Sequence, residues 1–172
     1  ESDILVDKDV VLFKEHFQLC EKYTFKSPVL FPSGFTRDFL DEKVSTPSLE
    51  KKILSSFEHI SHANDFVLVE GTGHMGVGSI VNLNNAQVAK LLNLEVVIVA
   101  SGGIGKAYDE LALNINMCES HGVKVRGVIL NRVYKEKREM IINYVTKALA
   151  KVGIPLIGCI PYSNFLSAPS LN

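Results

Sequence analysis

Apolar residues along this chain fall into short continuous runs that alternate with stripes of helical spacing. A short continuous run is typical of an interior strand of a parallel sheet, because both faces of such a strand are covered. Apolar residues three and four positions apart are typical of a helix with one buried face. The predicted strands are 66–70, 96–100, 125–130 and 156–160, and the predicted helices are 8–21, 48–63, 82–92, 108–120 and 135–152.

The order of these elements predicts the fold class. Strands that alternate with helices of this length form a parallel sheet with right-handed crossovers. We therefore predict an α/β fold with three layers, α/β/α, in which a mainly parallel sheet has flanking helices. Residues 23–44, which contain Pro28, Pro32 and Gly34, are predicted to be irregular.

The first predicted strand ends in a carboxylate, within the run FVLVEGTGHMG from Phe66 to Gly76. Glu70 would stand at the carboxyl edge of the sheet, where open α/β folds bind ligands. The glycines that follow it would let backbone N–H groups approach an anion or a small substrate closely. The pattern predicts a ligand site around Glu70.

Two glycine-rich turns follow predicted strands. Gly71–Gly76 matches G-x-G-x-x-G, but no helix opens within it and the next strand does not end in an acidic residue, which argues against dinucleotide binding. Ser101–Gly105 is either a tight connection to the next helix or part of a site. The chain contains no G-x-x-x-x-G-K-[ST] phosphate-binding loop, and we expect its single domain, residues 1–172, to be incomplete at both ends.

Composition and charge limit the partners and the location that the sequence favours. The chain has 172 residues, 47% of them hydrophobic and 22% charged, and a formal net charge of −1. Without a cluster of Lys and Arg, the sequence favours neither nucleic acid nor a membrane as a partner, and no apolar run has transmembrane length. Cys20, Cys118 and Cys159 are predicted to be buried free thiols, which favours a reducing compartment and a cytoplasmic location.

Three motifs in order carry a family resemblance. The first motif is VEGTGHMGVGS around Glu70, and the second is the strand–turn–helix–strand run from VVIVASGGIGKA to LNRV, which contains Asn131. The third is LIGCIP, which ends at Pro161. These motifs resemble segments of dethiobiotin synthetases. The match extends from about Phe66 to Pro161. The remainder, including SPVLFPSGFTRDFLD at 27–41, most resembles the dethiobiotin-synthetase-like module found alone or at the N-terminus of some bacterial phosphotransacetylases.

The resemblance implies a P-loop NTPase fold of the dethiobiotin synthetase and cobyrinic acid a,c-diamide synthase superfamily. In that superfamily an upstream loop binds the ATP phosphates, and the γ-phosphoryl group passes to a carboxylate or carbamate. The resemblance also implies ATP and Mg²⁺ as cofactors, a small carboxylate or metabolite as a further partner, and a homodimer. The implied roles are catalysis and metal binding for Glu70, substrate binding for Gly71, Thr72, Gly73 and His74, and nucleotide binding for Asn131 and Pro161.

Each of the polar residues also has a structural interpretation. Glu70 could accept backbone N–H bonds from its own glycine turn, and Asn131 could satisfy its own backbone after a strand. His74 replaces a small glycine of the family pattern, which would reshape the substrate pocket. It could act as an acid or base, or it could be structural or solvent-facing.

Other polar residues are weaker candidates. His59 and His62 lie three residues apart on a predicted helix without a third ligand, which argues against zinc. Lys106 could reach a phosphate or simply be exposed, and Arg37 and Asp38 could form a local ion pair or a lid contact.

The sequence therefore leaves three functions open. The chain is an ATP-dependent enzyme that activates a small carboxylate, a nucleotide- or metabolite-sensing regulatory module of a larger protein such as a phosphotransacetylase, or an interaction protein without a ligand. Without the phosphate loop, we expect the chain by itself to bind ATP more weakly than about 1 mM.

Overall fold

The computed structural model describes Val6 and residues 8–165. Contacts divide the chain into two compact units. The helical unit comprises the residues up to Gly73 together with Val77–Leu92, and the sheet unit comprises His74–Gly76 and the residues from Asn93 onward. That the chain forms one dethiobiotin-synthetase-like domain stays a prediction.

The helical unit contains five α-helices and one 3-10 helix among its described residues. These are α1 (Lys8–His16), α2 (Tyr23–Lys26), α3 (Phe35–Leu40), α4 (Thr46–His62), η1 (Ser79–Val81) and α5 (Asn85–Leu91). The predicted helix 8–21 ends at His16, and the stretch predicted to be irregular contains α2 and α3, so both predictions were partly wrong. Helices of four and six residues are too short to display an apolar stripe that a sequence pattern could reveal.

The core of the helical unit forms around Leu49 of α4, together with Val81 and Leu83. Ser45 stands at the N-cap position of α4 and Pro47 lies in its first turn, where its missing N–H costs nothing. The Thr46 hydroxyl donates to the Val81 carbonyl over 3.0 Å, which ties the start of α4 to η1. Leu54, an apolar residue of α4, is 43% exposed.

Helix α5 begins with a complete capping box. The Asn84 side chain accepts from the Gln87 N–H, and the Gln87 side chain accepts from the Asn84 N–H, each over 2.9 Å. Asn84 is 4% exposed, so these bonds satisfy polar groups that water does not reach. The predicted helix 82–92 is confirmed as α5, with later start and slightly earlier end.

Residues 66–70, predicted to form an interior strand, do not form a strand. Phe66 and Leu68 are 81% and 84% exposed, and Val67 is half-buried. A strand requires hydrogen bonds to a neighbouring strand, and no described residue of the helical unit belongs to a strand. Glu70 consequently does not end a strand at a sheet edge, which corrects the expectation drawn from the apolar run.

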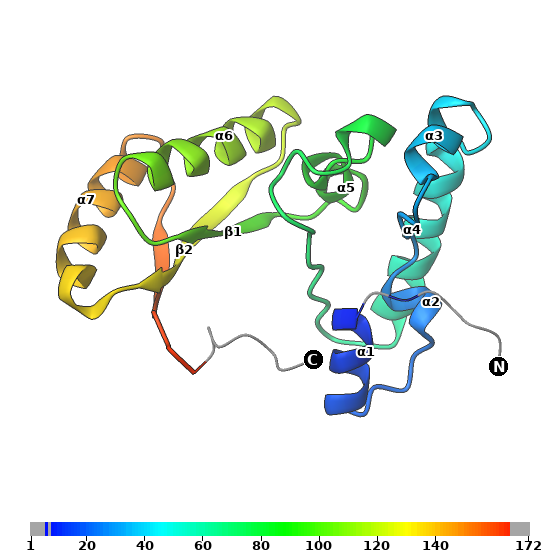
Figure 1. Cartoon of the computed structure of the whole chain (residues 1–172), viewed down its shortest axis with the longest axis horizontal. Helices are drawn as coiled ribbons and strands as arrows, with labels where there is room; N and C mark the ends of the chain where they lie inside the picture. Colours follow the sequence, from blue (N-terminus) through cyan, green and yellow to red (C-terminus); the bar gives the residue numbers. More distant parts are fainter. Residues whose placement is uncertain (1–5, 7, 166–172) are drawn as a thin grey trace. The chain divides into compact units, whose positions relative to one another are not determined.

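The sheet unit alternates strands and helices as predicted (Figure 1). Its elements are β1 (Val96–Ser101), α6 (Lys106–Ser120), β2 (Val125–Val133), η2 (Lys135–Lys137), α7 (Arg138–Ala150) and β3 (Leu156–Pro161). The three strands pair in parallel in the order β1-β2-β3. The α/β class, with a parallel sheet flanked by helices, is confirmed.

Burial differs between the two faces of this sheet. Ile98, Val128 and Leu130 are at most 7% exposed, as are Leu111, Ile115, Ile141, Val145 and Leu149 from α6 and α7. On the alternate positions, Val97 is 46%, Val99 60% and Ile157 53% exposed. Right-handed crossovers between successive neighbouring strands carry both helices to one face, which explains this difference.

The three cysteines are free thiols, as predicted, but their burial differs. Cys118 is fully buried, Cys159 is half-buried and Cys20 is exposed, so the prediction that all three are buried was wrong for Cys20. Cys20 lies just beyond the end of α1, a helix without buried residues. Burial, with a smaller effect of the Glu119 charge, raises the pKa of the Cys118 thiol.

Within residues 8–165, no helix has both the length and the apolar character that a membrane span requires.

Candidate functional site

The Glu70 segment lies in the helical unit and is attached to the start of α5. The Asn85 side chain donates to the Thr72 carbonyl over 3.0 Å. A Cβ on Gly71 would lie 2.9 Å from the Asn85 side-chain carbon, so a larger residue there would displace the Asn85 side chain. Glu70 and the three residues after it are exposed, which leaves the Glu70 carboxylate accessible to a ligand.

A second glycine closes the turn that returns the chain to α5. Gly78 has a φ of +97°, and its carbonyl accepts from the N–H groups of Val81 and Leu83, each over 3.1 Å. A Cβ at this position would lie 2.2 Å from the Leu83 carbonyl oxygen. The glycines of this loop therefore serve backbone geometry first.

His74 and its two neighbours belong to the sheet unit, where α6 holds them. The Met75 N–H donates to the Asn114 side chain over 2.8 Å, and that side chain donates in turn to the Glu110 carbonyl. The Gly76 N–H donates to Nδ1 of His74 over 3.1 Å. This bond makes Nδ1 of His74 an acceptor, which favours the ring tautomer with its hydrogen at Nε2.

The carboxyl ends of the three strands are joined by backbone hydrogen bonds. The Gly102 N–H donates to the Asn131 carbonyl over 2.7 Å, and the Tyr162 N–H donates to the Val133 carbonyl over 2.9 Å. A Cβ on Gly102 would lie 2.3 Å from a Val133 methyl carbon. This glycine of the Ser101–Gly105 turn therefore allows close packing of β1 against β2, which favours its interpretation as a tight connection.

Asn131 stands at the edge formed by these ends, in an irregular part of β2. Its side-chain oxygen accepts from the Arg132 N–H over 2.8 Å, so its structural interpretation is correct for that oxygen. Arg132 has a φ of +58°, a conformation that residues other than glycine seldom adopt. Such backbone outliers cluster at functional sites.

Pro161 lies on the neighbouring strand at the same edge, paired in register with Val133. The structure thus brings Asn131 and Pro161 to one edge of the sheet. The other predicted site residues lie elsewhere: Glu70, Gly71, Thr72 and Gly73 belong to the helical unit. His74 belongs to the sheet unit, next to Met75, which bonds to Asn114. The ligand roles of these residues stay predictions.

Sequence reasoning missed two aromatic residues at this edge. Tyr134 directly follows β2, Tyr162 directly follows β3, and their rings stack with centroids 4.9 Å apart. Each follows a motif that carried the family resemblance, which is a signal the sequence offers. Their contact, however, depends on the pairing of β2 with β3.

The weaker candidates have local partners. Lys106 is exposed and lies 3.7 Å from the Glu110 carboxylate. Lys43 lies 2.9 Å from the Asp38 carboxylate and 3.4 Å from that of Asp41, and the hydrogen bond to Asp38 is the main reason why the pKa of Lys43 is raised. Asp38 therefore has an ion-pair partner other than Arg37.

The two histidines of α4 have structural contacts. The His59 ring stacks on Phe25 with centroids 3.9 Å apart, and Nδ1 of His62 lies 2.7 Å from the Glu58 carbonyl. These contacts connect α4 to α2 and to its own preceding turn, and they account for both residues without a metal.

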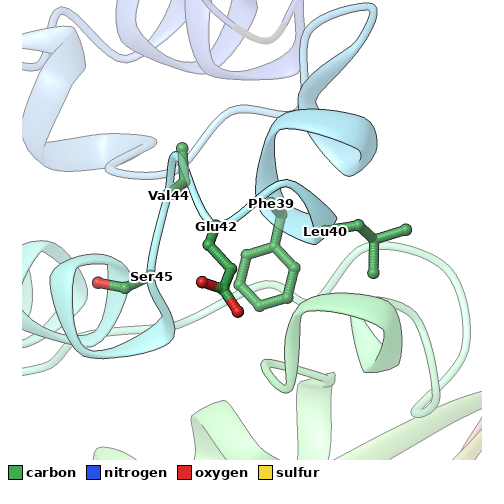
Figure 2. Close-up of a pocket in the computed structure, with 5 residues that line it drawn as sticks. All are labelled: Phe39, Leu40, Glu42, Val44 and Ser45. Carbon is green, nitrogen blue, oxygen red and sulfur yellow. The ribbon is translucent and has the colours of Figure 1, made fainter.

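A pocket opens in the helical unit beside the turn between α3 and α4. Figure 2 shows its lining residues, Phe39, Leu40, Glu42, Val44 and Ser45. Phe39 and Val44 also pack against the core of this unit. The pocket contains none of the residues that the sequence predicts to bind ligand.

Magnesium was predicted at Glu70. Within the described part of the chain, no three His, Cys, Asp or Glu side chains gather in a way that could hold a metal. Mg²⁺ keeps several waters and is commonly bound by one or two carboxylates together with substrate phosphates. One exposed carboxylate on a glycine-rich loop fits such a site when the phosphates supply the other oxygens.

A parallel sheet with helical crossovers between its strands defines the α/β class of fold. A family model described as an AAA domain matches residues 1–170, so this chain belongs to that family. It is 24% identical over 165 residues to the ATP-dependent dethiobiotin synthetase BioD of Nitrosopumilus maritimus, a match that covers 96% of this chain and 72% of the relative.

Two further relatives are larger proteins. The chain is 25% identical over 134 residues to the phosphate acetyltransferase of Synechocystis sp., covering 76% of this chain and 19% of that protein. It is 26% identical over 122 residues to a probable cobyric acid synthase of Methanocaldococcus jannaschii, covering 69% of this chain and 25% of that protein. The predicted resemblance to this group is confirmed as distant homology.

Proposed function

We propose that this chain is a dethiobiotin-synthetase-like nucleotide-binding domain that uses ATP with Mg²⁺. The observation that supports this proposal is the carboxyl edge of the sheet formed by β1, β2 and β3, where Asn131 and Pro161 lie on neighbouring strands. Open α/β sheets bind their ligands outside this edge. A relative named as ATP-dependent supports a nucleotide as the ligand.

The proposed contacts follow the chemistry of each side chain. The Asn131 amide donates to an acceptor on the adenine edge through Nδ2, and Pro161 packs near the base. Gly71, Thr72, Gly73 and His74 line the substrate. Glu70 holds Mg²⁺, which when bound neutralises charge on the phosphate oxygens.

In the enzymatic form of this proposal, a carboxylate oxygen of a small substrate attacks the γ-phosphorus of ATP. The bond from that phosphorus to the bridging oxygen breaks, ADP leaves with the electron pair, and an acyl phosphate forms. The names of the dethiobiotin synthetase relatives support this form. The same resemblance supports a homodimer, and the free thiols support a location in the cytoplasm.

In the regulatory form, the domain binds a nucleotide or metabolite without chemistry and acts within a larger protein. The match to phosphate acetyltransferase supports this form, since three quarters of this chain correspond to about one fifth of that protein. The two forms differ in one observable, the release of ADP when a small carboxylate is added.

The test uses calorimetry on the full-length protein with ATP and Mg²⁺. Glu70→Gln keeps the size of the side chain but removes its charge, and we expect it to abolish the Mg²⁺-dependent part of nucleotide binding. Because Glu70 is exposed, the free energy of unfolding should change by less than about 0.5 kcal/mol. Glu58→Gln, at an exposed position of α4, is the matched control and should bind as the natural protein does.

Unchanged Mg²⁺-dependent binding in Glu70→Gln would contradict the metal-binding role of Glu70 and favour its structural interpretation. A full-length protein that binds no nucleotide would contradict the proposed function itself.

A further inference from the structure

Two tyrosines stack on one another at the carboxyl edge of the sheet. Tyr134 and Tyr162 have ring centroids 4.9 Å apart and an interplanar angle of 30°. Tyr134 is 55% exposed and Tyr162 is partly buried. An aromatic ring exposed to this extent contributes little to the core, so burial does not explain why the pair stands there.

The backbone fixes the positions of both rings. The Tyr162 N–H donates to the Val133 carbonyl over 2.9 Å, which extends the pairing of β2 with β3 beyond Pro161. Val133, directly before Tyr134, is fully buried and packs against Gly102 of the next strand end. The tyrosine pair therefore stands on a rigid support, and it needs no rearrangement to present a flat aromatic surface.

A polar side chain on the strand that leads to Tyr134 suits a flat heteroaromatic ligand. Asn131 lies three residues before Tyr134, and its oxygen is already bonded to the Arg132 N–H. Within the described residues no hydrogen bond is found from its Nδ2, which leaves a donor for a ring nitrogen. The positive φ of Arg132 turns the backbone between this amide and the aromatic ring.

The spacing of the two rings decides where a ligand can stack. A third ring between them would need roughly twice the distance of one stacking contact, more than the 4.9 Å between their centroids. A ligand ring therefore stacks on the exposed face of Tyr134, while Tyr162 supports Tyr134 from behind. Stacking of this kind recognises any nucleobase by its face, and hydrogen bonds such as that from Asn131 add preference for one base.

We propose that Tyr134, supported by Tyr162, is the stacking platform for the nucleobase of the bound nucleotide. This inference rests on the proposed function, and it assigns the base contact to residues that neither the sequence motifs nor the relatives had indicated.

The experiment measures ATP·Mg²⁺ binding by calorimetry in the full-length protein, together with saturation-transfer NMR on the adenine H2 and H8 protons. Tyr134→Leu should weaken ATP binding about 5- to 150-fold, the range expected for loss of one base–aromatic stack, and should reduce the saturation of H2 and H8. Tyr134→Phe keeps the ring and should bind as the natural protein does. Tyr144→Leu, at a tyrosine of α7 that is 53% exposed, is the matched control and should change neither measurement.

Thermal unfolding of each variant verifies that it folds. Equal ATP affinity in Tyr134→Leu and the natural protein overturns the platform and leaves nucleotide binding intact. An equal loss in Tyr134→Phe also overturns it, because the ring would then be irrelevant. No ATP binding in the natural protein overturns the proposed function and this inference with it.

Discussion

The loop from Glu70 to Gly78 combines two features, an accessible carboxylate at Glu70 and an unusual backbone conformation at its glycines. Gly78 is required by its positive φ and its close contact with the Leu83 backbone, whatever the loop binds, whereas a side chain at Gly71 would displace that of Asn85. The motif was therefore visible in the sequence, but its glycines alone do not distinguish a ligand site from a tight turn. Glu70, Thr72 and His74 are exposed there and offer a carboxylate, a hydroxyl and an imidazole.

Gly78 is the glycine of this loop that a larger residue could least replace. We expect Gly78→Ala to destabilise the protein by about 2 to 4 kcal/mol, because a strained φ is combined with a collision against the Leu83 carbonyl. Gly122→Ala is the control, since Gly122 also has a positive φ but a Cβ there meets no atom within 4 Å. It should cost about 1 kcal/mol. Urea unfolding measures both, and equal losses would refute the collision.

At the scale of elements, the sequence predicted what periodicity can reveal. The pattern VVIVAS became β1, and the stripe of the next helix became α6, with its end near Gly122. The run 66–70 has the same apolar character but pairs with no strand among the described residues, and the hydrogen-bond partner of a strand cannot be read from its own residues. The same limit hid the Tyr134–Tyr162 contact, which exists only because β2 pairs with β3.

One element boundary could have been predicted more closely. Asn84 and Gln87 are three residues apart, as in a capping box, and they begin α5. Asn84→Ala should lower the free energy of unfolding by about 1 to 2 kcal/mol, because the Asn84 side chain no longer accepts from the Gln87 N–H or donates to the Ser79 hydroxyl at a buried position. Lys90→Ala, on the exposed side of α5, should change it by less than about 0.5 kcal/mol. Chemical denaturation compares the two, and a loss no larger in Asn84→Ala would show that the cap is not stabilising.

At the scale of the whole molecule, the chain combines a helical unit that contains Glu70 with a sheet unit that contains Asn131 and Pro161. Membership of the AAA domain family and distant homology to ATP-dependent dethiobiotin synthetases agree with the fold class predicted from the sequence. The substrate could not be predicted, because two of the four candidate substrate residues, Gly71 and Gly73, are glycines whose backbone, not side chain, would make the contacts.

The central claim is that a nucleotide binds at the carboxyl edge of β1, β2 and β3. The most direct test is a ¹H–¹⁵N NMR titration of the full-length protein with ATP and Mg²⁺. We predict that the amide signals of Asn131, Tyr134 and Tyr162 shift together along one saturable curve, while those of the Phe39–Ser45 pocket stay unchanged. Saturable shifts confined to residues outside the strand ends, or no shifts at all, would contradict the claim.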